Sequence, residues 1–92
     1  MGRPVIEREA VIVNQEGLHA RPAARIVRLA SSFASDIELS KDGLDVNAKS
    51  IMGVMMLAAE CGSSITIKAS GADAERAVQA LTDLVAGGFG EK

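Results

Sequence analysis

Residues 17–24 read Gly17-Leu18-His19-Ala20-Arg21-Pro22-Ala23-Ala24, and an extended segment changes into a helix within them. From Ala20 onward the apolar side chains follow helical spacing, at Ala23, Ile26, Val27 and Ala30. Pro22 falls in the first turn, where a missing backbone N–H removes no hydrogen bond. The spacing predicts a helix from Ala20 to about Ser31.

This helix carries a second stripe besides the apolar one. Arg21, Arg25 and Arg28 follow each other at intervals of four and three residues, so they share one face. A charged stripe is usually a solvated surface. Next to an apolar patch, it would instead steer an acidic partner toward the protein.

The segment before the junction, Val5 to Val13, predicts a strand because it is rich in β-branched residues. We expect Ile6, Ala10 and Ile12 to face inward. Val11 and Val13 would then lie on the other side of the strand.

The remainder of the chain predicts a hairpin, a short helix, a strand and a last helix. The hairpin strands are 36–40 and 44–48, joined by a turn at Lys41-Asp42-Gly43. Ser50 is a typical N-cap for a helix from Ile51 to about Glu60, which would end at Cys61-Gly62. A strand over Ser64 to Ser70 follows, and Asp73 caps or opens the last helix, which glycines 87 and 88 stop.

The predicted element order is β-α-β-β-α-β-α, an α/β chain of the α+β type. One-sided helices and half-apolar strands favour two layers, in which helices cover one face of a mostly antiparallel sheet and the other face meets solvent. We expect one domain over residues 1–92, with an aliphatic core, because the chain has only two aromatic residues.

Composition excludes several classes of function. A net charge of −2 argues against a general nucleic-acid binder, which needs a basic surplus. One cysteine permits no internal disulfide and fits a reducing compartment. No signal peptide or membrane span is visible, so we expect a cytoplasmic protein that does not bind membranes, and a monomer by default.

His19 is the most informative single residue. A histidine at a strand-to-helix junction lies beside the free N–H groups and the positive end of the helix, which together favour a bound anion. The positive end of the helix disfavours the imidazolium form of the ring, so we expect a neutral, nucleophilic imidazole. Arg21 adds a guanidinium suited to phosphate oxygens. Phosphoryl transfer needs positioning and charge stabilisation of this kind.

Other readings of His19 are weaker. It is the only histidine and no cysteine is near it in sequence, so we expect neither a metal site nor a cofactor. No nucleophile elbow is present to favour a hydrolase. A purely structural capping histidine is the simplest alternative.

Two segments of this chain resemble signatures of one family. Residues 17–23 are similar to the active-site signature of HPr, the histidine phosphocarrier of the bacterial phosphoenolpyruvate-dependent phosphotransferase system. Residues 49–55, Lys49-Ser50-Ile51-Met52-Gly53-Val54-Met55, resemble the second signature of that family at the expected separation. The resemblance runs from about Val5 to Phe89, and the ending of the chain is similar to proteobacterial members.

The resemblance implies an open-faced β-sandwich of four antiparallel strands with three helices on one face. It implies that His19 accepts a phosphoryl group on Nδ1 from phosphorylated enzyme I and passes it to an enzyme IIA domain. Arg21 would pair with the phosphate, and the backbone N–H groups of Ala20 and Arg21 would cradle it. Such a protein is a carrier that is transiently phosphorylated on histidine, and it is not itself a true catalyst.

Ser50 carries a second expectation. By itself it is a helix cap. Its segment is also similar to the form of the family in which this serine is phosphorylated by an ATP-dependent HPr kinase/phosphorylase, so regulation at Ser50 is an open alternative to simple capping.

The short helix supplies an expected partner surface. Val54 and Leu57 fit its inward side, and we expect Met56 to fill the core as well. Methionine-rich surfaces suit several partners. The predicted partner-binding residues beside His19 are Leu18, Arg21, Arg25, Ile51, Met52 and Met55. Cys61 is expected to be small and partly buried.

Two other functions remain open at this stage. One is a regulatory or nitrogen-branch phosphocarrier that signals phosphorylation state and does not serve sugar uptake. The other is an interaction module that is never phosphorylated, because a fold alone does not prove function.

Overall fold

The elements follow one another in the predicted order in the computed structural model, which describes residues 4–90. The strands and helices are β1 (Ile6–Val11), α1 (Ala20–Ser31), β2 (Asp36–Lys41), β3 (Leu44–Asn47), α2 (Ile51–Met56), β4 (Ser64–Ser70) and α3 (Ala74–Ala86). A 3-10 turn, η1 (Gly88–Gly90), follows α3.

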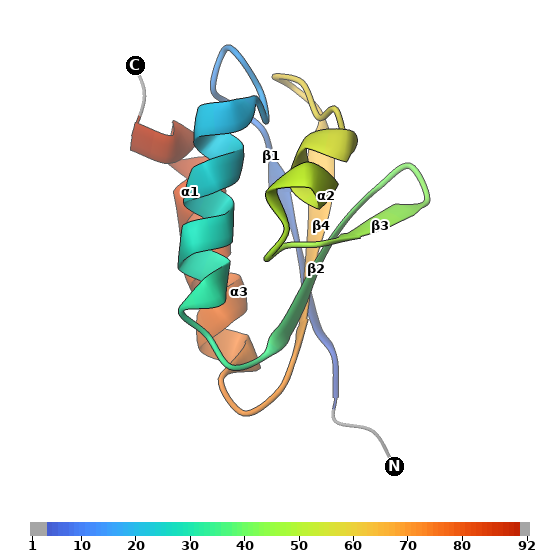
Figure 1. The fold of residues 1–92 in the computed structure, drawn as a ribbon, viewed down its shortest axis with the longest axis vertical. Helices are drawn as coiled ribbons and strands as arrows, with labels where there is room; N and C mark the ends of the chain where they lie inside the picture. The colour runs from blue at the N-terminus through green and yellow to red at the C-terminus, as the bar shows by residue number, and fades with distance from the viewer. Residues whose placement is uncertain (1–3, 91–92) are drawn as a thin grey trace.

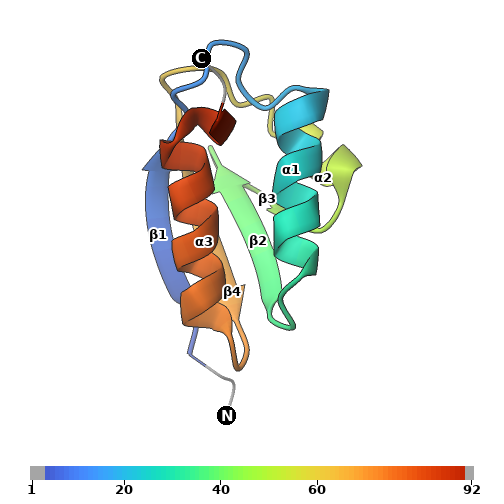
Figure 2. The same cartoon turned by 90° about the vertical axis from the view of Figure 1, so that its left-hand side faces the viewer.

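The strands form one antiparallel sheet in the order β1-β4-β2-β3. In this register Ala10 pairs with Ile65 and Leu39 pairs with both Ile67 and Val46. The helices lie together on one side of the sheet, with α1 and α3 side by side (Figures 1 and 2). This confirms the expected two-layer fold.

Side chains alternate across the sheet as the sequence predicts. In β1, Ile6 packs against the core and Ala10 is buried, while Val11 is exposed. Ile12 and Val13, just after the strand, continue the pattern as buried and exposed residues. The predicted strand over 5–13 is therefore right in its inward and outward sides but longer than the paired segment.

The core is aliphatic except for Phe89, which is fully buried after the end of α3. Its backbone adopts φ 60°, a left-handed conformation that is uncommon outside glycine. The turn lies beside the N-terminal end of α1 (Figure 1), and the Arg25 guanidinium donates a hydrogen bond to the Phe89 carbonyl.

Helix α2 is shorter than expected. It ends at Met56 with Leu57 as C-cap, so the predicted end near Glu60 is wrong. Ala58 has φ 50°, which turns the backbone out of the helix four residues before Gly62. Gly62 is also left-handed, but it belongs to the turn that leads into β4.

Asp73 occupies the N-cap position of α3, but its side chain makes no capping hydrogen bond. The carboxylate instead accepts hydrogen bonds from Ala34 and Ser35, between α1 and β2. Asp73 therefore opens the helix, as expected, without capping it. No helix among residues 4–90 is long and apolar enough to span a bilayer.

Candidate functional site

His19 is the N-cap residue of α1, and its side chain is exposed. Its backbone is extended, with φ −71° and ψ −175°, and its carbonyl accepts a hydrogen bond of 2.9 Å from the Ala23 N–H. The side chain makes no capping hydrogen bond. The backbone of His19 thus begins the helix while the ring remains available to react.

The loop before His19 is held tightly. Asn14 Nδ2 donates to the Gly17 carbonyl at 2.8 Å, and the Gly17 N–H donates to the Asn14 carbonyl at 3.2 Å. Leu18 donates its N–H to the Ala59 carbonyl at 2.9 Å. Both neighbours of the ring on the N-terminal side, Gly17 and Leu18, are buried. These hydrogen bonds and this burial fix the backbone that leads into His19.

The first turn of α1 offers N–H groups to an anion. The first hydrogen bond within α1 runs from the Ala23 N–H to the His19 carbonyl. Because Pro22 has no N–H, the free backbone donors of this turn are those of Ala20 and Arg21. Among the described residues of this turn none is acidic. The position that the resemblance assigns to the phosphate cradle is thus the positive end of a twelve-residue helix.

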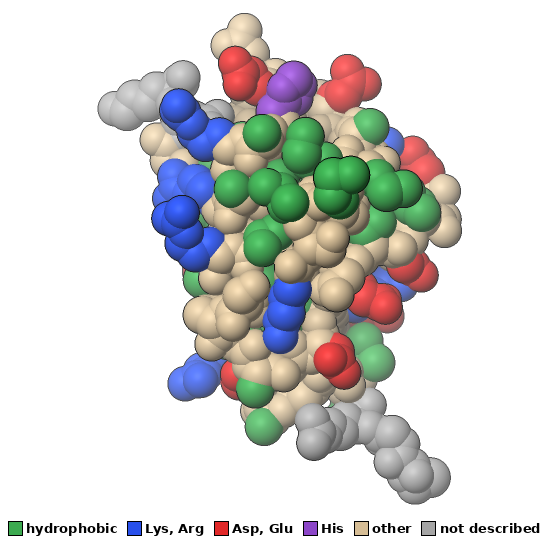
Figure 3. Space-filling view, in the orientation of Figure 1, with side chains coloured by type: hydrophobic (Ala, Val, Ile, Leu, Met, Phe, Trp, Pro, Cys, Tyr) green, Lys and Arg blue, Asp and Glu red, His purple; other side chains and the backbone are tan. Residues whose placement is uncertain are grey.

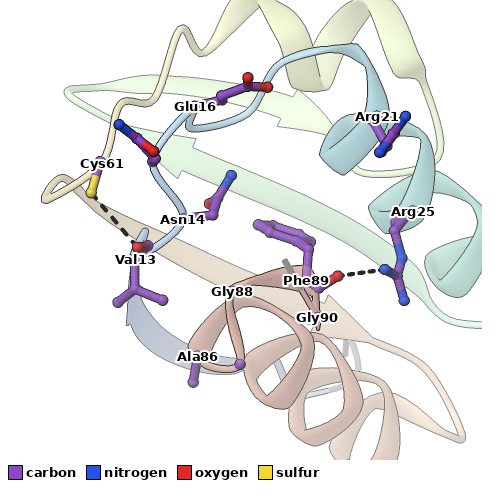
Figure 4. A pocket seen from close by; sticks show the side chains of 12 residues that line it. Val13, Asn14, Glu16, Arg21, Arg25, Cys61, Ala86, Gly88, Phe89 and Gly90 are labelled. Atoms are coloured by element: carbon purple, nitrogen blue, oxygen red, sulfur yellow. Dashed lines mark hydrogen bonds between the residues drawn. The ribbon is translucent and has the colours of Figure 1, made fainter. Parts of the chain in front are cut away.

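Arg21 and Arg25 line a hollow between the first turns of α1 and the turn that contains Phe89 (Figure 4). Both side chains are exposed. Arg25 is tied to the Phe89 carbonyl, as the dashed line in Figure 4 shows, whereas Arg21 projects from the turn that begins at His19. Arg21 makes no such tie to the turn of Phe89.

An apolar surface lies beside His19 over α2 (Figure 3). Met52 is 70% exposed, and Ile51 and Met55 are about two-fifths exposed, which confirms that they face solvent. Met56 is 65% exposed, so its predicted place in the core is wrong. We call Ile51, Met52, Met55 and Met56 the α2 patch. Lys and Arg side chains lie along the α1 side of the same view.

Leu18 does not belong to this surface. Its side chain is 4% exposed and lies in the core, because the bond to Ala59 holds the backbone with Leu18 inward and His19 outward. The structure does not support Leu18 as part of an exposed partner surface, because its side chain is buried. Val54 and Leu57 are buried, as expected.

His19 and Met55 line one shallow depression together with the segment after α2. The remaining lining residues are Gln15, Glu16, Leu18, Ala58, Ala59, Glu60 and Cys61. Cys61 is exposed, which corrects its predicted partial burial. Sequence reasoning missed Ala58 and Ala59, because alanine carries no local signal for a contact made across the fold.

Ser50 is the N-cap of α2, as predicted. Its Oγ accepts a hydrogen bond of 3.2 Å from the Gly53 N–H. The neighbouring Lys49 donates through Nζ to the Phe33 carbonyl at 2.9 Å, which ties the start of α2 to the segment between α1 and β2. Ser50 is half-buried and directly precedes Ile51, the first residue of the α2 patch.

Comparison with known proteins gives one consistent result. The family model described as "PTS HPr component phosphorylation site" matches residues 6–87. A protein named phosphocarrier protein HPr from Cupriavidus necator is 47% identical over 87 residues, which cover 95% of this chain and 98% of that protein. This chain belongs to the HPr family.

Solved HPr structures agree with the fold. The crystal structure of HPr-C-His from Thermoanaerobacter tengcongensis superposes with a TM-score of 0.91 at 48% identity, and the match covers 95% of this chain and 98% of that one. A structure of the HPr dimer from the same organism matches with a TM-score of 0.76 at 51% identity, over 87% and 92% of the two chains. The resemblance stated from the two signatures is confirmed, as is the four-stranded sheet with three helices.

Proposed function

We propose that His19 carries a phosphoryl group from phosphorylated enzyme I to enzyme IIA domains of the phosphotransferase system. The observation that carries this proposal is the exposed ring of His19 at the N-terminus of α1. The backbone N–H groups of Ala20 and Arg21 have no partner within the helix. The first turn of α1 contains no acidic residue. Membership of the HPr family supports a phosphocarrier role in the same system.

The proposed reaction is an in-line displacement at phosphorus. Nδ1 of the His19 ring attacks through its lone pair, the N–P bond forms, and the bond between phosphorus and its donor atom on enzyme I breaks. The helix N–H groups and the Arg21 guanidinium stabilise the three phosphoryl oxygens. The same contacts can act in a second in-line displacement, in which an acceptor atom of enzyme IIA attacks phosphorus and the N–P bond of His19 breaks. The protein is a carrier that ends each cycle unchanged.

The α2 patch is the proposed docking surface for both partners. Its four side chains are exposed beside the ring, and methionine adapts to different partner surfaces. Arg21 and Arg25 would guide partners with acidic surfaces toward it. Because ring and patch are exposed on one chain, we propose a monomeric carrier with a single domain over 1–92, supported by the continuous core of the described residues.

Ser50 is the proposed regulatory site, modified by an HPr kinase/phosphorylase. A phosphate there would add about −1.5 to −2 charges. Because Ser50 caps a helix N-terminus, the helix tolerates the negative charge. The added charge beside the α2 patch would instead repel an acidic partner.

The test is to incubate the protein with phosphoenolpyruvate, Mg²⁺ and enzyme I, and to measure its mass before and after acid treatment. We expect one acid-labile phosphoryl group on the parent and on Ser50→Ala, and none on His19→Ala. An unmodified parent, or an adduct that survives in His19→Ala, would refute the acceptor role of His19. An unmodified parent would favour an interaction module that is never phosphorylated.

A further inference from the structure

The segment Leu57–Ala59 connects the α2 patch to the loop of His19. On one side, the Ala58 N–H donates to the Met55 carbonyl at 3.0 Å. On the other, the Ala59 carbonyl accepts from the Leu18 N–H at 2.9 Å. Two backbone hydrogen bonds and one peptide unit therefore separate a residue of the patch from the neighbour of His19.

Ala58 has an unusual backbone for its residue type. Its φ is 50°, in the left-handed region that non-glycine residues seldom adopt and that β-branched residues avoid almost entirely. The side chain of Ala58 is exposed, so packing of the methyl group does not explain this conformation. What the conformation achieves is a sharp turn after α2 that presents the next carbonyl, of Ala59, to Leu18.

The contact is as tight from the opposite side. Gly17 is itself left-handed, with φ 69°, and a Cβ on it would lie 2.4 Å from the Ala59 carbonyl oxygen. No larger residue fits at position 17 unless this carbonyl moves. The two loops therefore fix each other's position, and His19 follows two residues after Gly17.

We propose that Ala58 is a positioning residue for phosphoryl transfer. Its left-handed backbone aims the Ala59 carbonyl at Leu18, and so sets the place of the His19 ring relative to a partner held on the α2 patch. The backbone of Ala58 performs this role, and its side chain does not. The inference rests on the proposed carrier function and adds a residue that acts through Leu18 without touching the phosphoryl group.

Three substitutions at Ala58 separate the effect of its backbone conformation from the effect of side-chain size. Ala58→Gly keeps access to the left-handed conformation and removes the methyl group. Ala58→Asn adds bulk at the surface but tolerates the same conformation, while Ala58→Val adds bulk and disfavours it. The experiment measures single-turnover transfer from phosphorylated enzyme I over a range of enzyme I concentrations. Amide hydrogen exchange of Leu18 and thermal unfolding are measured on the same samples.

We expect Ala58→Val to lower the rate at saturating enzyme I by about tenfold, since small displacements of reacting groups have effects of this order. The enzyme I concentration at half-maximal rate should stay near the parent value, and the Leu18 amide should exchange faster. Ala58→Gly and Ala58→Asn should transfer at close to the parent rate. If Ala58→Val is too unstable to assay, Gly17→Ala tests the same contact from the other side and should give the same loss at saturation.

Equal loss in Ala58→Asn and Ala58→Val would overturn the inference, because bulk at the surface would then explain both. A saturating rate equal to the parent's in Ala58→Val, or in Gly17→Ala where that variant is needed, would also overturn it. Either result leaves His19 as the acceptor. A parent protein that is not phosphorylated at all would instead refute the proposed function, and this inference with it.

Discussion

Asp73 and Ser35 are 38 positions apart in the sequence and are joined by two hydrogen bonds to one carboxylate oxygen. The Ser35 N–H donates to Asp73 Oδ1 at 2.9 Å, and the Ser35 hydroxyl donates to the same oxygen. The Ala34 N–H donates to the other oxygen at 2.8 Å. The Ser35 hydroxyl and the Ala34 N–H lower the pKa of the Asp73 carboxyl from 3.8 to about 2.

This carboxylate predicts a pH dependence of stability. A carboxyl whose pKa is lower in the folded than in the unfolded chain stabilises the fold above the unfolded value, and the effect is lost as pH falls through the folded one. The free energy of unfolding should therefore decline between pH 3.8 and about 2. Urea unfolding at a series of pH values measures it. Asp73→Asn should flatten that part of the curve, and an unchanged slope would contradict the assignment.

Ala58→Gly should stabilise the protein, although glycine usually destabilises. Relief of the left-handed strain at φ 50° is expected to raise the free energy of unfolding by up to about 1 kcal/mol. The matched control is Ala72→Gly, also exposed but without a positive φ, which should be neutral or destabilising. Chemical denaturation of the two variants should give shifts of opposite direction. Equal destabilisation in both would show that Ala58 is not strained.

Much of the fold follows from local pattern. Helix α1 lies at its predicted bounds, Ala20–Ser31, because a proline in the first turn and four regularly spaced apolar residues define it. The inward side of β1 is also right, because alternation along a strand decides which residues reach the core. The end of α2 could not be predicted, since neither the positive φ of Ala58 nor the hydrogen bond between Leu18 and Ala59 across the fold has a local sequence signal.

The candidate site shows the same division. His19, Arg21 and Ser50 lie where the two signatures place them, at the N-termini of α1 and α2. The burial of two side chains is the opposite of what was expected: Leu18 is buried and Met56 is exposed. Hydrophobicity alone does not tell which apolar residue near a turn faces the core, because the tertiary contacts of the turn decide it.

Ser50→Asp should keep the fold and slow phosphoryl transfer from enzyme I. Aspartate caps a helix as well as serine does, so α2 should remain formed, while the added negative charge opposes an acidic partner. Circular dichroism and the rate of phosphorylation measure the two effects. Ser64→Asp, an exposed serine in β4, is the charge-matched control and should transfer at the parent rate. Equal rates in the parent and Ser50→Asp would rule out regulation by charge at this site.

Met52→Glu should weaken binding of enzyme I with little change in stability. Met52 is 70% exposed in the α2 patch, so the substitution removes apolar docking surface without opening a cavity. Titration calorimetry with unphosphorylated enzyme I should show a loss of about tenfold in affinity, a typical effect for a central interface residue. Val5→Glu, at an exposed valine before β1, should bind like the parent. Unaltered binding by Met52→Glu would place the docking surface elsewhere.

The most direct measurement of the carrier role follows one phosphoryl group through both transfers. The protein is labelled from phosphoenolpyruvate and enzyme I, separated from them, and mixed with an enzyme IIA domain. Mass spectrometry then follows the phosphoryl group on each chain. We predict that the label sits on His19 and moves from this chain to the IIA domain mole for mole. A label that stays on this chain, or that resides on another residue, would contradict the proposed carrier role of His19.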